Sequence, residues 1–170
     1  MPKISLNTNL VLIGMPGVGK STIGVLLAKV TSRNFLDTDI YIQAKEGRSL
    51  QEIIDREGTE GFCRIEERHV LSLNCRSCVI ATGGSVVYHP KAMRHLGSSG
   101  IVIHLDLPAL ERRITNLDSR GVVMAQGQTF SQLFTERQSL YRKYAQYTVP
   151  CGNRIHEQVV GEIIRQLGIS

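Results

Sequence analysis

The chain has 170 residues, of which 42% are hydrophobic, and carries 20 Lys and Arg against 15 Asp and Glu, a net charge of +5. This length suits one compact domain, so we expect residues 1–170 to form a single domain that acts as a monomer, and the charge is too small and dispersed to indicate a nucleic-acid surface. Because no export signal and no apolar run of membrane-spanning length stands out, we expect a cytoplasmic protein without a membrane partner.

Short apolar runs alternate with helical patterns, which predicts an α/β fold with a parallel sheet flanked by helices. Strands are predicted at residues 9–13, 34–36, 78–81 and 101–105, with a weaker one at 147–149. Helices are predicted at residues 19–30, 39–46, 50–57, 59–73, 108–116, 130–145 and 155–167. Residues 117–129 break the alternation and contain Arg120, which predicts a mobile lid or, as the alternative, a surface loop.

The four cysteines predict reduced thiols, because they are too few for a disulfide framework. Cys75 and Cys78 could form half of a zinc site, but no second pair stands at ligand spacing. The simpler interpretation is that Cys78 begins a buried strand and Cys75 lies in the loop before it.

Residues 14–21 match the phosphate-binding pattern G-x-x-x-x-G-K-[ST], and they lie between a predicted strand and a predicted helix. Glycines let the backbone N–H groups point at phosphate oxygens, Lys20 can reach the β- and γ-phosphates, and Ser21 can hold Mg²⁺. The pattern therefore predicts ATP and Mg²⁺ as ligands. The residues expected at the nucleotide are Gly14, Gly17, Val18, Gly19, Lys20, Ser21 and Thr22.

Two carboxylates, Asp37 and Asp39, follow the second predicted strand. Ligands of an open α/β sheet bind at this edge, so Asp37 could hold Mg²⁺ through water and Asp39 could orient or deprotonate an acceptor hydroxyl. One of them could instead cap the next helix, and both roles can coexist. No convincing match to GTPase base-specificity or switch motifs is present, which favours a small-molecule kinase.

With these residues the sequence resembles the shikimate kinases over nearly its whole length. The segments that carry the resemblance, besides the phosphate loop, are LDTD at 36–39, GRS at 47–49, F-x-R-I-E-E at 62–67, ATGG at 81–84, Arg120, and ERQSLY at 136–141. The resemblance implies a three-layer P-loop fold with a five-stranded parallel sheet and a mobile lid. It also implies transfer of the ATP γ-phosphate to a hydroxyl of a small hydroxy-acid, with shikimate as the first candidate.

The resemblance also implies roles for single residues. It makes Asp37 the Mg²⁺-linked aspartate and Asp39 the base that binds the substrate hydroxyls. The other implied roles are a turn against the substrate at Gly83 and Gly84, a carboxylate-binding Arg137, a lid arginine Arg120 that closes on the transferring phosphate, and adenine contacts from Arg113 and Arg154. Three alternatives stay open. The glycines could only end a strand, Arg137 could pair with a helix carboxylate, and Arg120 could be a solvated charge.

Three positions depart from the family pattern. Cys63 stands where the family has a carboxylate-binding arginine, Ser85 replaces the third glycine of a GGG turn, and Gly121 replaces the proline after the lid arginine. The neighbouring Arg64 would point about 100° away on a helix. We keep Cys63 among the substrate-binding positions and expect weak carboxylate binding. There are two alternatives to a shikimate kinase: a kinase that acts on a different small hydroxy-compound, and a nucleotide-binding module without turnover.

Overall fold

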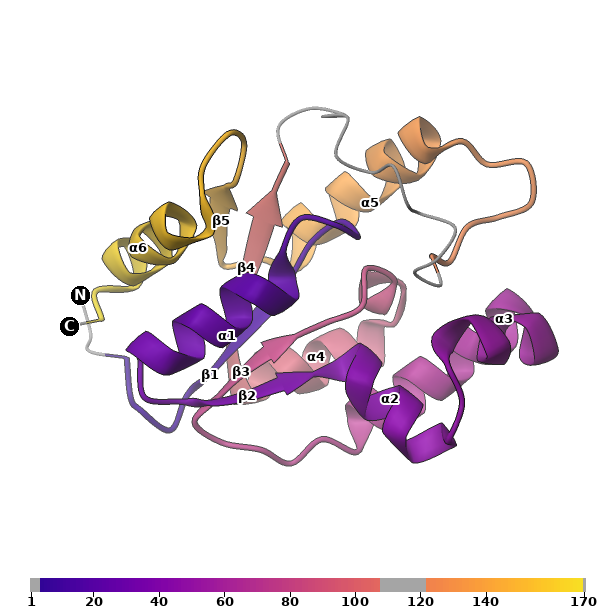
Figure 1. Ribbon diagram of the computed structural model, residues 1–170, viewed down its shortest axis with the longest axis horizontal. Helices are drawn as coiled ribbons and strands as arrows, with labels where there is room; N and C mark the ends of the chain where they lie inside the picture. The colour runs from indigo at the N-terminus through magenta and orange to yellow at the C-terminus, as the bar shows by residue number, and fades with distance from the viewer. Residues whose placement is uncertain (1–3, 108–121, 170) are drawn as a thin grey trace.

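The structure, a computed structural model, describes residues 4–107 and 122–169 and contains a five-stranded parallel sheet with helices on both faces (Figure 1). The strands are β1 (Asn9–Ile13), β2 (Asn34–Asp37), β3 (Cys78–Ala81), β4 (Gly100–Asp106) and β5 (Tyr147–Pro150). Their order in the sheet is β2-β3-β1-β4-β5. The predicted α/β class and all five predicted strands are confirmed, including the weaker one at the C-terminal end.

The helices in the described ranges include the predicted ones and two further elements. They are α1 (Lys20–Val30), α2 (Thr38–Glu46), α3 (Leu50–Leu71), the 3₁₀ helix η1 (Val86–Tyr88), α4 (Pro90–Ser99), α5 (Phe130–Tyr144) and α6 (His156–Leu167). Neither η1 nor α4 was predicted from the sequence; α4 has ten residues and buries Ala92, Met93 and Leu96 on one face. The predicted helix 108–116 and residues 117–121 of the predicted lid lie outside the described residues. Residues 122–129 form neither helix nor strand.

Alternation along β1 divides the core between the two faces of the sheet. Leu10 and Leu12 pack with α1 and α6 on one face, whereas Val11 and Ile13 pack with α4 and α5 on the other. All four side chains are fully buried, as expected for a central strand of a parallel sheet. None of the helices in the described ranges is long and apolar enough to cross a membrane.

The carboxyl ends of the parallel strands bring distant segments to one edge. The register pairs Ala81 with both Leu12 and Asp37, and Ile13 with His104. The phosphate loop, the two aspartates after β2 and the glycines after β3 therefore leave the sheet side by side. This edge is where an open α/β sheet binds its ligands.

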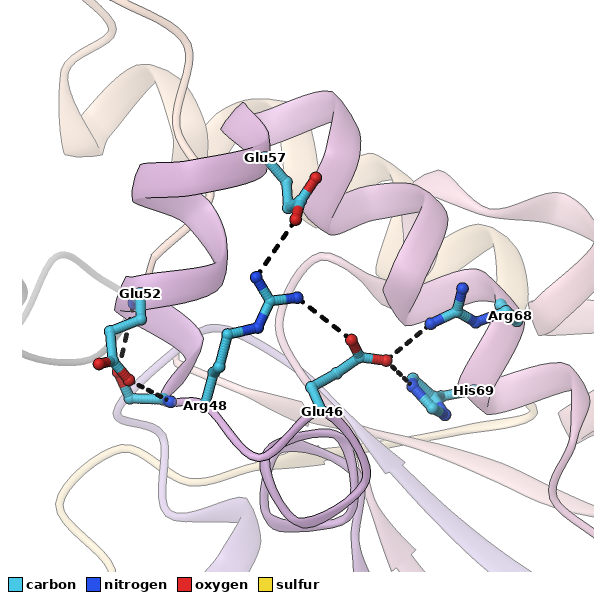
Figure 2. A network of polar contacts seen from close by, with 7 residues as sticks. Glu46, Arg48, Glu52, Glu57, Arg68 and His69 are labelled. Atoms are coloured by element: carbon cyan, nitrogen blue, oxygen red, sulfur yellow. Dashed lines mark hydrogen bonds and ion pairs between the residues drawn. The ribbon is translucent and has the colours of Figure 1, made fainter.

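Helices α2 and α3 lie beside this edge and are linked by polar side-chain contacts. Gly58 interrupts α3 with φ 68° and ψ 176°, which agrees with the two separate helices predicted at 50–57 and 59–73. Figure 2 shows how Glu46 at the end of α2 contacts Arg68 and His69 at 2.6 Å each and Arg48 at 3.3 Å. These ion pairs link the end of α2 to the far half of α3 and so fix both helices against each other.

Candidate active site

The loop between β1 and α1 is shaped to bind phosphate. Gly17 and Gly19 have φ angles of 82° and 100°, which residues with side chains rarely adopt, and α1 begins directly after them at Lys20. The Lys20 Nζ atom donates to the carbonyl oxygens of Gly14 at 2.7 Å and Met15 at 2.8 Å, so the ammonium group folds over the loop. A glycine-rich loop that opens a helix directs N–H groups at an anion.

The charge of Lys20 is poorly solvated. Burial lowers the pKa of Lys20 to about 8, the charge of Arg137 acts in the same direction, and the carboxylates of Asp39 and Asp37 oppose both. A cation without a full hydration shell interacts strongly with an anion that enters its site. Lys20 is therefore suited to hold phosphate oxygens.

Ser21 and Asp37 meet at the starts of α1 and α2. Ser21 Oγ donates to Asp37 Oδ2 at 2.5 Å, and Asp37 Oδ1 accepts from the backbone N–H groups of Asp39 and Ile40 as the N-cap of α2. The capping alternative is thus confirmed for Asp37, and it leaves the second carboxylate oxygen beside the Ser21 hydroxyl. Hydroxyl and carboxylate oxygens are ligands that Mg²⁺ prefers, so this pair fits the ion.

The metal would bring most of its remaining ligands with it. Mg²⁺ keeps several waters and binds substrate phosphates rather than a complete protein cage. Within residues 4–107 and 122–169, no group of three or more His, Cys, Asp or Glu side chains is arranged to hold a metal. Cys78 begins β3 in the buried core, as the simpler interpretation of Cys75 and Cys78 predicted.

Two carboxylates flank the Cα atom of Gly83, just after β3. A Cβ atom added to Gly83 would lie 2.6 Å from Glu66 Oε1 and 2.9 Å from Asp39 Oδ1. Burial raises the pKa of Asp39 to about 7, the negative charges of Glu66 and Asp37 act in the same direction, and Lys20 opposes them. Asp39 is therefore a carboxylate that can take up a proton near neutral pH.

One cavity of about 720 Å³ joins these groups. Its phosphate end is lined by Pro16, Gly17 and residues 19–22. Its acceptor end is lined by Asp39, residues 82–85 and Arg137, with Val122 and Val123 along one side. The cavity thus connects the phosphate loop to the Asp39 carboxylate and to a buried cation.

Arg137 on α5 is the buried cation of the acceptor end. It is 1% exposed, its Nη2 atom donates to the carbonyl oxygen of Val123 at 2.6 Å, and its Nε atom donates to the Tyr88 hydroxyl at 3.3 Å. A Cβ atom added to Gly84 would lie 2.9 Å from Arg137 Nη1. Arg137 forms no ion pair with any described residue, so the alternative of a helix carboxylate partner is wrong. A buried guanidinium without a carboxylate suits an anionic ligand.

The similarity to known proteins agrees with this geometry. A family model described as shikimate kinase matches residues 16–168. The chain belongs to the shikimate kinase family. The shikimate kinase of Nitrosomonas europaea is 36% identical over 169 residues, which cover 96% of this chain and 80% of that protein.

Solved structures of the family have the same fold. A shikimate kinase from Acinetobacter baumannii in complex with shikimate matches with a TM-score of 0.84 and 28% identity, over 95% of this chain and 93% of that one. The shikimate kinase from Aquifex aeolicus matches with a TM-score of 0.80 and 30% identity, over 95% of this chain and 96% of that one. The predicted three-layer P-loop fold and the family resemblance are therefore confirmed.

The other residues to which the family resemblance assigned a role do not all line the main cavity. Arg154 and Val18 line a smaller cavity of about 50 Å³ beside the phosphate loop, where Arg154 is exposed and Val18 is buried. Arg113 and Arg120 lie outside the described residues. Cys63 does not line the main cavity, so its predicted direct contact with substrate finds no support in the cavity lining.

Sequence reasoning missed three polar residues near this shikimate kinase site. His156, at the start of α6, lines both cavities and would lie 3.1 Å from a Cβ atom added to Gly19. Glu66 and His89 lie behind the acceptor end, within 3.0 Å of each other. Glu66 falls within the family segment F-x-R-I-E-E and could have been found there, whereas no local pattern indicates His89 or His156.

Proposed function

We propose that this member of the shikimate kinase family transfers the γ-phosphate of ATP to a hydroxyl group of shikimate, with Mg²⁺ as the metal. The observation that carries the proposal is that Lys20, Asp39 and Arg137 reach one cavity from three separate elements. They supply a cation for phosphate, a base that titrates near neutral pH and a cation for a carboxylate. A hydroxy-acid that accepts phosphate needs all three in one site.

In this mechanism the phosphate loop and Lys20 hold the β- and γ-phosphates, while Arg137 holds the shikimate carboxylate. Asp39 accepts the proton of the reacting hydroxyl as the new O–P bond forms and the bond between the γ-phosphorus and the bridging oxygen breaks. ADP leaves with the electron pair of that bond. Bound Mg²⁺, next to Ser21 and Asp37, would supply positive charge to the phosphate oxygens. Positioning and electrostatics provide most of the acceleration in such a transfer.

The remaining roles rest on the family resemblance. We assign Arg120 to the transferring phosphate and Arg113 and Arg154 to the adenine end. The turn at Gly83 and Gly84 would let the substrate ring approach the backbone, because a side chain at either position would meet Asp39, Glu66 or Arg137. A nucleotide-binding module without turnover has no use for a buried base such as Asp39, which favours a kinase.

We further propose that the protein acts as a monomer in the cytoplasm, with ATP and a small hydroxy-acid as its partners and without nucleic acid. Among residues 4–107 and 122–169, the exposed large apolar side chains are spread over several separate elements rather than gathered on one helix. Sedimentation equilibrium should give one chain per particle, and a concentration-dependent dimer would contradict the proposal.

Replacement of Asp39 by Asn tests the catalytic part of the proposal. The amide keeps the shape of the side chain but cannot accept a proton, so kcat should fall by roughly 10²- to 10⁴-fold. ATP affinity, measured by calorimetry, should stay unchanged. Asp55→Asn is the matched control, because Asp55 is an exposed carboxylate on α3 that bonds only Gln51 among described side chains. Loss of ATP affinity without loss of turnover in Asp39→Asn would show that Asp39 is a structural residue.

A further inference from the structure

Glu66 is a fully buried carboxylate behind the acceptor end of the cavity. Its Oε2 atom accepts a hydrogen bond from Ser85 Oγ at 2.7 Å and lies 3.0 Å from His89 Nε2. Its Oε1 atom has no hydrogen-bond partner among the described residues and faces the Cα atom of Gly83. Because a buried carboxylate is costly unless it is paired, Ser85 and His89 are the partners that stabilise Glu66 in this position.

His89 provides a positive charge at this position. Burial lowers the pKa of His89, but its contacts with the Cys63 thiol and the Glu66 carboxylate outweigh burial and raise the pKa to about 9. Cys63 and Glu66 come from α3, and the hydroxyl of Ser85 comes from the turn after β3. His89 itself is the N-cap of α4, where the helix dipole disfavours a cation, so the charge depends on Glu66. At neutral pH the two side chains form an imidazolium–carboxylate pair.

This pair explains how two departures from the family pattern are related. Cys63 and Glu66 are three residues apart on α3, so an arginine at position 63 would lie beside the Glu66 carboxylate. In this chain a cysteine occupies that position, and the cation comes from His89 instead. A glycine at position 85 would likewise lack the hydroxyl that Ser85 donates to Glu66.

We propose that His89 is a positioning residue for the acceptor substrate, that it replaces the arginine of position 63 as the cationic partner of Glu66, and that Cys63, Ser85 and His89 function as one unit. The proposal rests on the proposed function. His89 acts through Glu66, whose carboxyl group it holds beside Asp39 with Oε1 free to accept a hydrogen bond from the acceptor side. The carboxylate of the substrate is then bound by Arg137 alone.

A double-mutant cycle tests the coupling of the unit. His89→Gln should raise the KM for shikimate about tenfold, the effect of one hydrogen bond to a charged group, and leave the KM for ATP unchanged. Cys63→Arg should also raise the KM for shikimate, because it adds a second cation beside the imidazolium. The double variant should have a lower KM than either single variant. His95→Gln, which changes a histidine of α4 that bonds the Leu73 carbonyl, is the control and should behave as wild type.

The pH dependence separates positioning from a merely structural role. In the wild type the KM for shikimate should rise as the pH passes about 9, when His89 loses its proton, and in His89→Gln this rise should be absent. Lys20 also titrates near this range, so the profiles of wild type and His89→Gln are compared at saturating ATP. The comparison is repeated in Cys63→Ser, because the Cys63 thiol contacts His89. Identical profiles, or additive effects in the cycle, would overturn the proposal.

A measurement without turnover distinguishes failure of this inference from failure of the proposed function. An NMR titration of ¹³C-labelled histidines in the ligand-free protein should show His89 losing its proton near pH 9. An ordinary value near 6.5 would overturn the inference even in an active shikimate kinase. A high value in a protein that does not phosphorylate shikimate would support the imidazolium–carboxylate pair and contradict only the assigned substrate. Because the titration uses wild type, it remains decisive if His89→Gln does not fold.

Discussion

Gly83→Ala probes the place where Asp39 and Glu66 meet. The new Cβ atom would lie 2.6 Å from Glu66 Oε1 and 2.9 Å from Asp39 Oδ1, and ordinary contacts begin at 3.4 Å. Both oxygens must therefore move by about half an ångström or more, although Ser85 and His89 hold Glu66 in place. Overpacking of this kind costs about 1–3 kcal/mol, and displacement of both carboxylates should lower kcat/KM for shikimate by about 10- to 100-fold.

The assay compares Gly83→Ala with Gly97→Ala. A Cβ atom at Gly97, in α4, would meet nothing within 4 Å, so Gly97→Ala should raise the free energy of unfolding by about 0.5–1 kcal/mol and leave the kinetics unchanged. Steady-state kinetics would be measured with shikimate and ATP varied in turn, and stability by urea unfolding. The KM for ATP should stay unchanged in both variants. Wild-type kcat/KM for shikimate together with wild-type stability in Gly83→Ala would refute the geometry described for Asp39 and Glu66.

Four further outcomes follow from the site. Lys20→Ala should lower kcat by several orders of magnitude in a steady-state ADP-release assay, since the phosphates lose their buried cation, and a near-normal kcat would exclude Lys20 from catalysis. The kcat of the wild type should rise with pH through about 7 as Asp39 loses its proton; an acid limb centred near pH 4 would mean that another group is the base. The pKa of Asp39 is higher in the folded state than in the unfolded state, so ionised Asp39 destabilises the fold at any pH above its unfolded-state pKa. Asp39→Asn should therefore have a higher urea midpoint than wild type at pH 8, and a lower midpoint would contradict the assigned burial. Arg137→Lys should raise the KM for shikimate about tenfold or more, because lysine cannot form the two parallel bonds that a guanidinium offers a carboxylate, and an unchanged KM would move carboxylate binding to another residue.

The phosphate half of the site could be predicted from the sequence because its geometry is encoded locally. Residues 14–21 contain the glycines of the loop, the lysine and the start of α1 in one short segment. Asp37 and Asp39 could be placed beside it because β1, β3 and β2 are parallel neighbours whose carboxyl ends lie at one edge. The family resemblance added Gly83, Gly84 and Arg137, which the structure places at the same cavity.

The acceptor half could be predicted only in part because it is assembled from distant segments. Cys63 and Ser85 were visible as departures from the family pattern, but nothing local showed that Ser85 bonds Glu66 and that Cys63 contacts His89. His89 precedes α4, a helix that the apolar pattern did not reveal. Arg64, the neighbour considered as a replacement for the missing arginine, is exposed and does not line the cavity. The compensating charge comes instead from a different element, which only the tertiary structure shows.

The central claim, phosphorylation of shikimate at this cavity, is tested most directly by following the purified protein with ³¹P NMR in the presence of ATP, Mg²⁺ and shikimate. We predict that a phosphomonoester signal of shikimate grows at the same rate as the signals of ADP, and that Asp39→Asn abolishes both. ADP formation that proceeds equally without shikimate, or inorganic phosphate as the only other product, would contradict the account.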